Sequence, residues 1–153
     1  VIEKVQFAEA GDWTLAGNGT RATNASVSAS LFVRVVEIDG VSVDPISLNA
    51  DLTFSPSDGT YNLVEDPGFT EIWTGGIEVD VSAMIAAAGN TGKATKVLIT
   101  LDNSLCAASE AGTVAHIKKK EINGLSITAI IPEPATLCLL AAGALWVGRR
   151  RCA

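Results

Sequence analysis

A strict alternation of apolar and polar residues between Val27 and Ile38 constrains the fold of this chain more than any other feature. Apolar side chains recur there at every second position: Val27, Ala29, Leu31, Val33 and Val35. Because successive side chains of a strand point to opposite faces, the pattern predicts a β-strand with one face buried. Asp39-Gly40 follows, and both residues tolerate positive φ, so we expect a tight hairpin turn into a return strand from Val41.

Shorter stretches with the same period lie on both sides of this strand, between turn signals rich in Gly, Pro, Asn and Asp. Gly11-Asp12 and Gly75-Gly76 are predicted to interrupt two of them. Asn123-Gly124 is predicted to join residues 114–122 and 125–131 into a closing hairpin. One short helix is expected at Ser82–Ala88, because alanines dominate there, Asp80 or Ser82 offers a cap, and Gly89 offers a C-terminal stop.

These elements predict an all-β fold. Seven to nine short strands with one brief helix and no repeat are typical of an antiparallel β-sandwich, with jelly-roll connectivity favoured over immunoglobulin-like. Residues 1–131 have the usual length of one domain and are expected to form it. The chain begins at Val1 without an apolar leader, so we expect it to be either a mature chain or a fragment.

Residues 132–153 differ in composition from everything before them. Pro132, Glu133 and Pro134 form a stiff hinge, because each proline removes a backbone donor and forces extended geometry on the residue before it. Residues 135–148 carry no charge and would span about 21 Å as a helix, short of a bilayer core unless the flanks add length. Arg149, Arg150 and Arg151 can extend to the headgroups and are expected to place the C-terminus in the cytoplasm, with residues 1–131 outside.

This tail closely resembles the C-terminal sorting signal of PEP-CTERM proteins, which are exported bacterial proteins. The resemblance rests on Pro132-Glu133-Pro134-Ala135-Thr136-Leu137, the Leu/Ala/Gly-rich segment and the three arginines, and Cys152-Ala153 departs from it. It implies an exosortase as partner, an inner-membrane intermediate, cleavage near the triplet, and delivery to the cell surface or the extracellular space. Such systems usually accompany exopolysaccharide and biofilm genes. An ordinary tail anchor is the alternative.

The charge of the chain disfavours a nucleic-acid partner. Its formal net charge is −6, and removal of the tail from Ala135 leaves eight basic against seventeen acidic residues, a net charge of −9. Such a surface repels polyanions and favours solubility. Lys118–Lys120 is the basic cluster of residues 1–131, and we expect solvated lysines at a strand edge rather than a polyanion site.

Few residues point to catalysis or metal binding. His116 is the only histidine, and no motif places a nucleophile beside it, although Cys106 lies ten residues upstream. One histidine and three cysteines without ligand spacing predict no metal site of that type. Glu65-Asp66 and the alternating pair Glu78 and Asp80 leave Ca²⁺ open, but solvated strand faces are the preferred interpretation. We therefore expect no enzyme activity and no cofactor.

Trp13 and Trp73 support one further hypothesis, a carbohydrate-binding module in which exposed indoles stack on sugar rings of extracellular polysaccharide. The alternative is that these scarce aromatics pack in the core. The favoured function is a structural protein of the cell surface or extracellular matrix. A subunit of a self-assembling extracellular filament, and so a homo-oligomer, is the second hypothesis.

Overall fold

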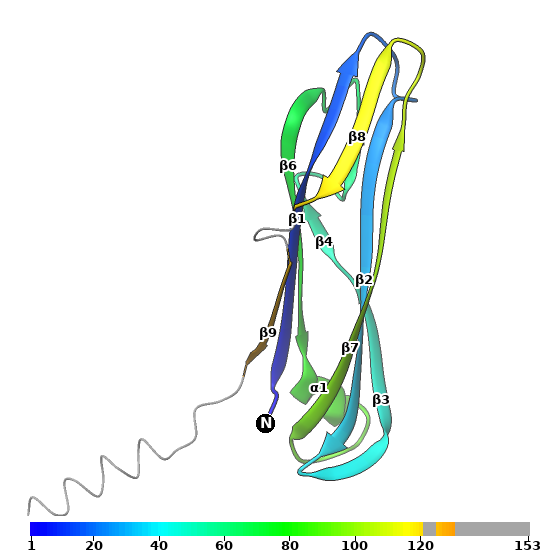
Figure 1. The fold of residues 1–153 in the computed structure, drawn as a ribbon. Coiled ribbons are helices and arrows are strands. Elements are labelled where there is room, and N and C mark those ends of the chain that lie inside the picture. The colour runs from blue at the N-terminus through cyan, green and yellow to red at the C-terminus, as the bar shows by residue number, and fades with distance from the viewer. Residues whose placement is uncertain (121–124, 131–153) are drawn as a thin grey trace, which may run out of the picture.

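A computed structural model describes residues 1–120 and 125–130 of the 153-residue chain. The described residues form two antiparallel sheets that face one another along a long, narrow sandwich (Figure 1). Within them, nine strands and one helix follow in chain order: β1 Lys4–Gly17, β2 Asn24–Ile38, β3 Val41–Asp51, β4 Thr53–Ser55, β5 Thr60–Asn62, β6 Gly68–Asp80, α1 Val81–Ala87, β7 Ala94–Ala108, β8 Thr113–Lys119 and β9 Leu125–Ile130.

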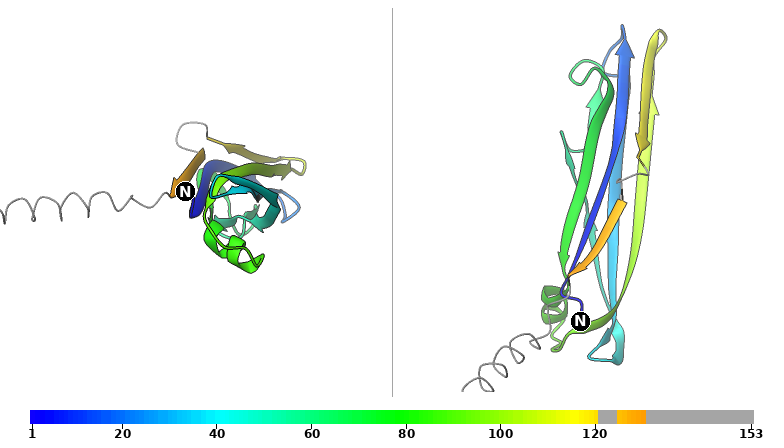
Figure 2. Two further views of the ribbon diagram at one scale, coloured as in Figure 1. Left: turned by 90° about the horizontal axis from the view of Figure 1, so that it is seen from below. Right: turned by 60° about the vertical axis from the view of Figure 1, so that its left-hand side comes forward.

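Each sheet is built around one long central strand. In the first sheet, β2 pairs with β7 along one edge, and β3 and β5 share the other edge. In the second sheet, β6 pairs with one edge of β1, β4 lies outside β6, and β8 and β9 share the other edge of β1. Figure 2 shows the narrow cross-section that results. The predicted all-β antiparallel sandwich with one short helix is confirmed, while its jelly-roll or immunoglobulin-like connectivity stays a prediction.

Several local predictions from the sequence are confirmed. β2 and β3 are joined at Asp39 and Gly40, which both have positive φ, 49° and 80°. Helix α1 has Asp80 as its N-cap, with Oδ1 accepting a hydrogen bond of 2.8 Å from the Ala83 amide. Gly89 has a φ of 74° just after the helix, as expected of a C-terminal stop.

The predicted interruptions at two glycine sites are wrong, because β1 and β6 each run straight through them. A Cβ atom at Gly11 would lie 2.4 Å from the Trp73 ring, and one at Gly75 would lie 2.5 Å from the Phe54 ring. These two glycines therefore make room for aromatic rings within continuous strands. The resulting strands are longer than the sequence predicted.

The predicted closing hairpin is also wrong. β8 pairs with Gly11–Gly17 of β1 and β9 pairs with Lys4–Glu9, both antiparallel. The two strands therefore run in the same direction, one after the other, along a single edge of β1. The 14 residues of β1 offer an edge long enough for both.

The sandwich has two hydrophobic core clusters rather than one. The cluster nearer α1 includes Val5, Phe7, Leu31 and Val33, and the cluster at the far end includes Trp13, Leu15, Val27, Tyr61 and Trp73. Full burial of such side chains contributes about 1.5–3 kcal/mol each. Phe54 packs against both clusters. Between them, at the level of Glu9, the interior carries polar side chains.

Candidate functional site

β9 leads from the sandwich into the predicted sorting tail. Its last residue, Ile130, lies opposite Lys4 in the β1 register, so the chain leaves the described fold beside its own N-terminus and close to α1 (Figure 1). The amides of Val81 and Ser82 both donate to the Glu3 carbonyl oxygen, at 2.8 and 3.3 Å. The start of the helix is thus tied to the N-terminal residues at this end.

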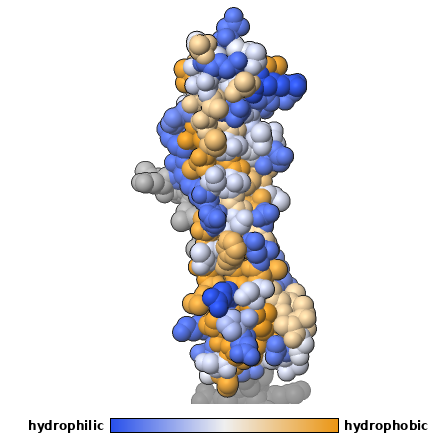
Figure 3. Space-filling model, turned by 90° about the vertical axis from the view of Figure 1, so that its right-hand side faces the viewer, coloured by the Kyte–Doolittle hydropathy of each residue, from blue (hydrophilic) through white to orange (hydrophobic). Residues whose placement is uncertain are grey.

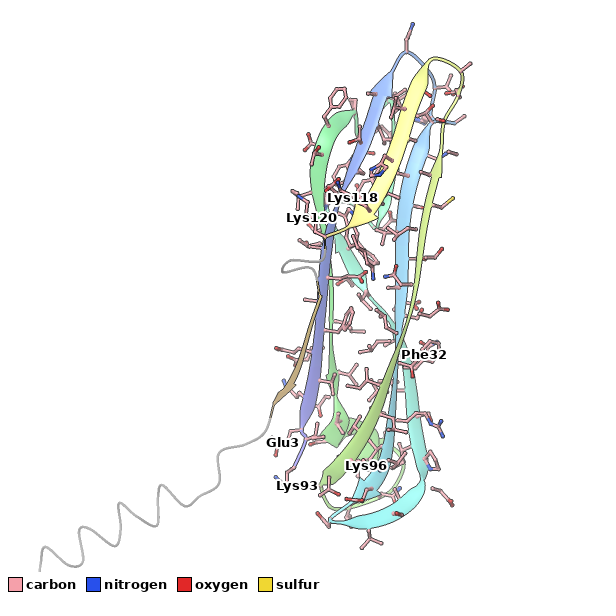
Figure 4. The ribbon with its side chains drawn as sticks, in the orientation of Figure 1. Glu3, Phe32, Lys93, Lys96, Lys118 and Lys120 are labelled. Carbon is pink, nitrogen blue, oxygen red and sulfur yellow. The ribbon has the colours of Figure 1, made fainter. Side chains whose placement is uncertain are left out.

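The same end also links the two sheets. Ile2 forms an isolated bridge with Ala94, the first residue of β7, and donates to its carbonyl oxygen at 2.8 Å. An ion pair of 2.8 Å joins Lys93 Nζ to a Glu3 carboxylate oxygen, and both side chains lie at the α1 end in Figure 4. The N-terminal residues beside the exit of the chain are therefore joined to the first sheet as well as to the second.

The residues predicted to act in sorting, Pro132, Glu133, Pro134, Arg149, Arg150 and Arg151, lie outside the described residues. The predicted apolar helix at residues 135–148 also lies outside them. Within the part of the chain that the structure does describe, no helix combines the length and the hydropathy needed to cross a membrane.

The carbohydrate-contact prediction for Trp13 and Trp73 is wrong. Trp13 is 5% exposed and Trp73 is fully buried. The Trp13 ring stacks on Tyr61 with centroids 3.9 Å apart, and its Nε1 donates to the Asp66 carbonyl oxygen at 3.3 Å. Neither indole can offer a face to a sugar, because the alternation that exposes one face of β1 and β6 turns these two side chains inward.

The fold does not gather the other residues considered for catalysis. His116 is exposed on β8 of the second sheet, opposite Thr14, whereas Cys106 is exposed on β7 of the first sheet, opposite Ser26. Among residues 1–120 and 125–130, no group of three or more His, Cys, Asp or Glu side chains is arranged to hold a metal ion.

The carboxylates singled out for Ca²⁺ have other partners. Glu65 accepts from Arg21 and from Asn62 Nδ2, and Asp66 accepts from the Asn62 amide, so this pair braces its own loop. Asp80 caps α1.

Glu78 lies on the outer face of the second sheet. It accepts hydrogen bonds from Lys4 at 2.5 Å and from Gln6 at 2.7 Å. The hydrogen bond from Lys4, and after it the one from Gln6, lowers the pKa of Glu78. These contacts stabilise the ionised carboxylate in a role that holds strands together.

The structure also contains a polar triad that the sequence does not predict, formed in the interior of the sandwich by Glu9 of β1, Asn103 of β7 and Lys119 of β8. The Glu9 carboxylate is completely buried, and Oε2 lies 2.5 Å from Lys119 Nζ. Asn103 Nδ2 donates to both Glu9 oxygens at 3.0 Å. The triad therefore joins strands of both sheets around one buried carboxylate.

A second buried carboxylate, Asp12, lies three residues along β1 and on the opposite face of this strand from Glu9. The Asp12 side chain is 2% exposed, with Lys120 Nζ at 3.5 Å and Lys118 Nζ at 3.8 Å from Oδ2. Figure 4 shows both lysines at the end of β8, midway along the body. The prediction that Lys118–Lys120 are three solvated lysines is thus wrong for Lys119, whose ammonium group pairs with the buried Glu9 carboxylate while 31% of its side chain stays exposed. The signal was the alternation itself: Ala115, Ile117 and Lys119 share one face of β8.

The chain resembles known proteins only in its tail. No curated protein and no solved structure matches the chain. Residues 131–151 match the family model of the PEP-CTERM protein-sorting motif, which confirms the resemblance drawn from the tail. The motif implies processing by an exosortase and export through the membrane to the cell surface or extracellular space, so the described sandwich is the cargo of a PEP-CTERM sorting signal.

Proposed function

We propose that this chain is a structural, non-enzymatic component of the bacterial cell surface or of the extracellular matrix around a biofilm. The observation that carries the proposal is the position of β9. This strand joins one end of a long sandwich to a sorting signal at residues 131–151 (Figure 1). A body attached by one end extends away from the membrane during sorting, and its far end is the part that meets partners.

Two further properties support this role. The buried polar side chains of Glu9 and Thr23 have partners within the fold, Glu9 in the triad and Thr23 with Glu110 and Thr113. The net charge of −9 without the tail from Ala135 keeps such a protein soluble and away from polyanions. We propose that the domain works by its presence and its contacts, without a cofactor and without bound Ca²⁺.

The route is tested by the intact mass of the protein recovered from native cells. We expect a surface or secreted species that ends near Pro134. A Glu133→Ala, Pro134→Ala double variant should remain in the membrane fraction, whereas Pro67→Ala, in the loop between β5 and β6, should be processed normally. A secreted species whose mass still includes Arg149–Ala153 would contradict cleavage.

The structural role is tested separately by deleting the gene and measuring cell adhesion and matrix retention. We expect both to fall, and expression of the wild-type protein to restore them. Unchanged adhesion and retention in the deletion strain would contradict the structural role while leaving the sorting route intact. The two results are therefore distinguishable.

A filament subunit is the second candidate, favoured by the edge of β7. Among the described residues β7 pairs with β2 and, at Ala94 alone, with Ile2, so the rest of its other edge offers backbone groups to a further strand along much of 15 residues. Figure 3 shows apolar side chains gathered, on the face that it presents, over the half nearer α1. Sedimentation of the purified protein over a concentration series tests this candidate. Filaments or large oligomers would support it, and a monomer at every concentration would contradict it.

A further inference from the structure

We propose that Lys119 and Asn103 form a covalent amide bond between their side chains, with Glu9 moving the protons. This modification site braces the two sheets of the sandwich from within. It goes beyond the proposed function and does not depend on it, because it follows from side-chain geometry in the described fold.

The three side chains reach the interior because of their strand positions. Val5, Phe7 and Glu9 alternate inward along β1, and Leu101 and Asn103 do so along β7. Ile117 and Lys119 continue the inward face of β8. At one level of the sandwich, each of three strands therefore carries a polar group where an apolar side chain is expected. These groups are a carboxylate on β1, an amide on β7 and an amine on β8. Interior positions of this kind are apolar unless the polar groups satisfy one another or act together.

The geometry brings both reacting groups to the same carboxylate. Lys119 Nζ lies 2.5 Å from Glu9 Oε2, and Asn103 Nδ2 lies 3.0 Å from each Glu9 oxygen. The amine and the amide thus meet at one oxygen atom, held by three different strands. Such fixed proximity replaces a reaction between freely diffusing groups by one within a rigid frame, which accelerates intramolecular reactions by large factors.

The surroundings exclude water from the carboxylate. The Glu9 side chain is completely buried and lies between the two hydrophobic core clusters, whereas the Lys119 side chain is 31% exposed. A Cβ atom at Gly75 would lie 2.5 Å from the Phe54 ring and 3.3 Å from Glu9 Cγ, so an aromatic ring and a strand backbone close over this site. In a site of low polarity, proton transfer between paired groups and attack by a neutral amine are favoured over their hydrated counterparts.

The reaction balances without any added reagent. Glu9 takes a proton from the Lys119 ammonium group, and the lone pair of the resulting amine attacks Asn103 Cγ to form the Nζ–Cγ bond. The Cγ–Nδ2 bond then breaks with its electron pair on Nδ2. Glu9 passes the two protons lost by Nζ to Nδ2, which leaves as ammonium, and Glu9 ends as the carboxylate it was at the start. No atom is oxidised or reduced, and the chain loses one ammonia, about 17 Da.

The test is peptide mapping of the folded, full-length chain by mass spectrometry. Trypsin cannot cleave after an acylated lysine, so we expect a branched product in which the peptide 97–118, which holds Asn103, is joined to Lys119. The intact mass should be lower by about 17 Da than the sequence mass. Asn123-Gly124 can lose the same mass as a cyclic imide, so the branched peptide decides the outcome.

Three variants assign the roles. Lys119→Arg keeps a cation beside Glu9 but has no amine to acylate, and it should abolish the branched peptide. Glu9→Gln keeps the shape of the side chain but takes no proton, and it should reduce the linked fraction at least tenfold. Lys118→Arg is the matched control, because this neighbouring lysine faces Asp12, and it should leave the linked fraction unchanged.

Circular dichroism confirms that each variant is folded before mapping. Separate peptides with an unmodified Asn103 and a free Lys119 in the folded wild-type chain would overturn the proposal. So would a deamidated Asn103 without a branch. If Glu9→Gln does not fold, the wild-type map and Lys119→Arg still decide whether the bond forms.

Discussion

Tyr61 shows how one buried hydroxyl ties the stability of the far core cluster to pH. The side chain is fully buried against Trp13, and its Oη has no hydrogen-bond partner in the described part of the chain. Burial, and after it the negative charges of Asp66 and Asp58, raises the pKa of Tyr61 to about 12. In the unfolded chain the pKa of tyrosine is about 10. Between about pH 10 and about pH 12 the Tyr61 hydroxyl is therefore ionised in the unfolded state but protonated in the folded state.

We therefore expect the free energy of unfolding to fall as the pH rises above about 10, by at most about 1.4 kcal/mol per pH unit from this group. Tyr61→Phe should remove that part of the fall and change stability at neutral pH by less than about 1 kcal/mol, because no hydrogen bond is lost. Urea unfolding of both proteins across this pH range makes the measurement. Parallel curves for the two proteins would contradict the expectation. Tyr61 is the only tyrosine, so tyrosinate absorbance reports its ionisation directly.

The carboxylate of Glu110 makes the stability of the protein depend on pH in the acidic range. Its carboxylate accepts from the Thr20 amide at 2.7 Å and from the hydroxyls of Thr20 and Thr23, and so joins the turn between β7 and β8 to the loop between β1 and β2. Hydrogen bonds, first from the Thr20 backbone amide and then from the Thr20 hydroxyl, lower the pKa of Glu110. A lowered pKa contributes stability above the unfolded value of about 4.3, and that contribution disappears as the pH falls through the folded pKa.

Glu110→Gln should therefore destabilise the protein at neutral pH, and the difference from wild type should shrink as the pH falls below about 4. Urea midpoints at neutral and acidic pH measure the difference. Glu71→Gln, an exposed carboxylate of β6, is the control and should differ little from wild type at either pH. A constant difference between Glu110→Gln and wild type at all pH values would argue against the hydrogen bonds as its cause.

At the level of elements, the shared edge of β1 is the arrangement that the sequence did not predict. Ala8 lies opposite Ser126 in the register of β1 and β9. Directly opposed strand residues have Cα atoms close enough for a disulfide. In a background where Cys106, Cys138 and Cys152 are serine, an Ala8→Cys, Ser126→Cys variant should form an intramolecular disulfide on mild oxidation. Thiol titration and peptide mapping detect it.

The control pair is Ala8→Cys with Thr128→Cys, which is two residues out of register and should oxidise much less. If the control pair oxidised as readily as the opposed pair, the register would be wrong. If neither pair oxidised, β9 would not lie on β1, and the hairpin expected from Asn123-Gly124 would have to be considered again.

Much of the fold could be predicted from local sequence, and the failures have a common physical cause. The alternation in β2, the Asp39-Gly40 turn and the capped helix α1 are set by neighbouring residues. The continuity of β1 through Gly11 depends on the distant ring of Trp73, which a local pattern cannot contain. The sharing of one edge by β8 and β9 likewise depends on the length of β1.

The sorting tail and the buried triad differ in the same way, because one depends on neighbouring residues and the other on distant ones. The tail was recognised because its signal is contiguous in sequence. The triad was missed because Glu9, Asn103 and Lys119 come from three strands and meet only when both sheets are assembled. Each of the three residues is polar at a position where the alternation of its strand calls for an apolar side chain. These three exceptions are the only local signal of the triad in the sequence.

At the scale of the whole molecule, the length of the strands sets the shape. β7 has 15 residues and extends roughly 50 Å. We expect the released domain that ends near Pro134 to have a radius of gyration clearly above the value of about 14 Å for a compact chain of this size. Small-angle X-ray scattering on a dilution series measures it. A value at the compact limit would contradict the long, narrow shape in Figure 2.

The attachment of β9 also decides how the domain responds to mechanical force. If the tail end is held and the far end is pulled, the pull acts along the axis of β9, which runs antiparallel to β1 and leaves the sandwich at the α1 end. Every hydrogen bond between the two strands is then loaded at once, in shear, instead of opening one after another like a zipper. A six-residue strand loaded in this way resists tension better than one whose bonds open singly.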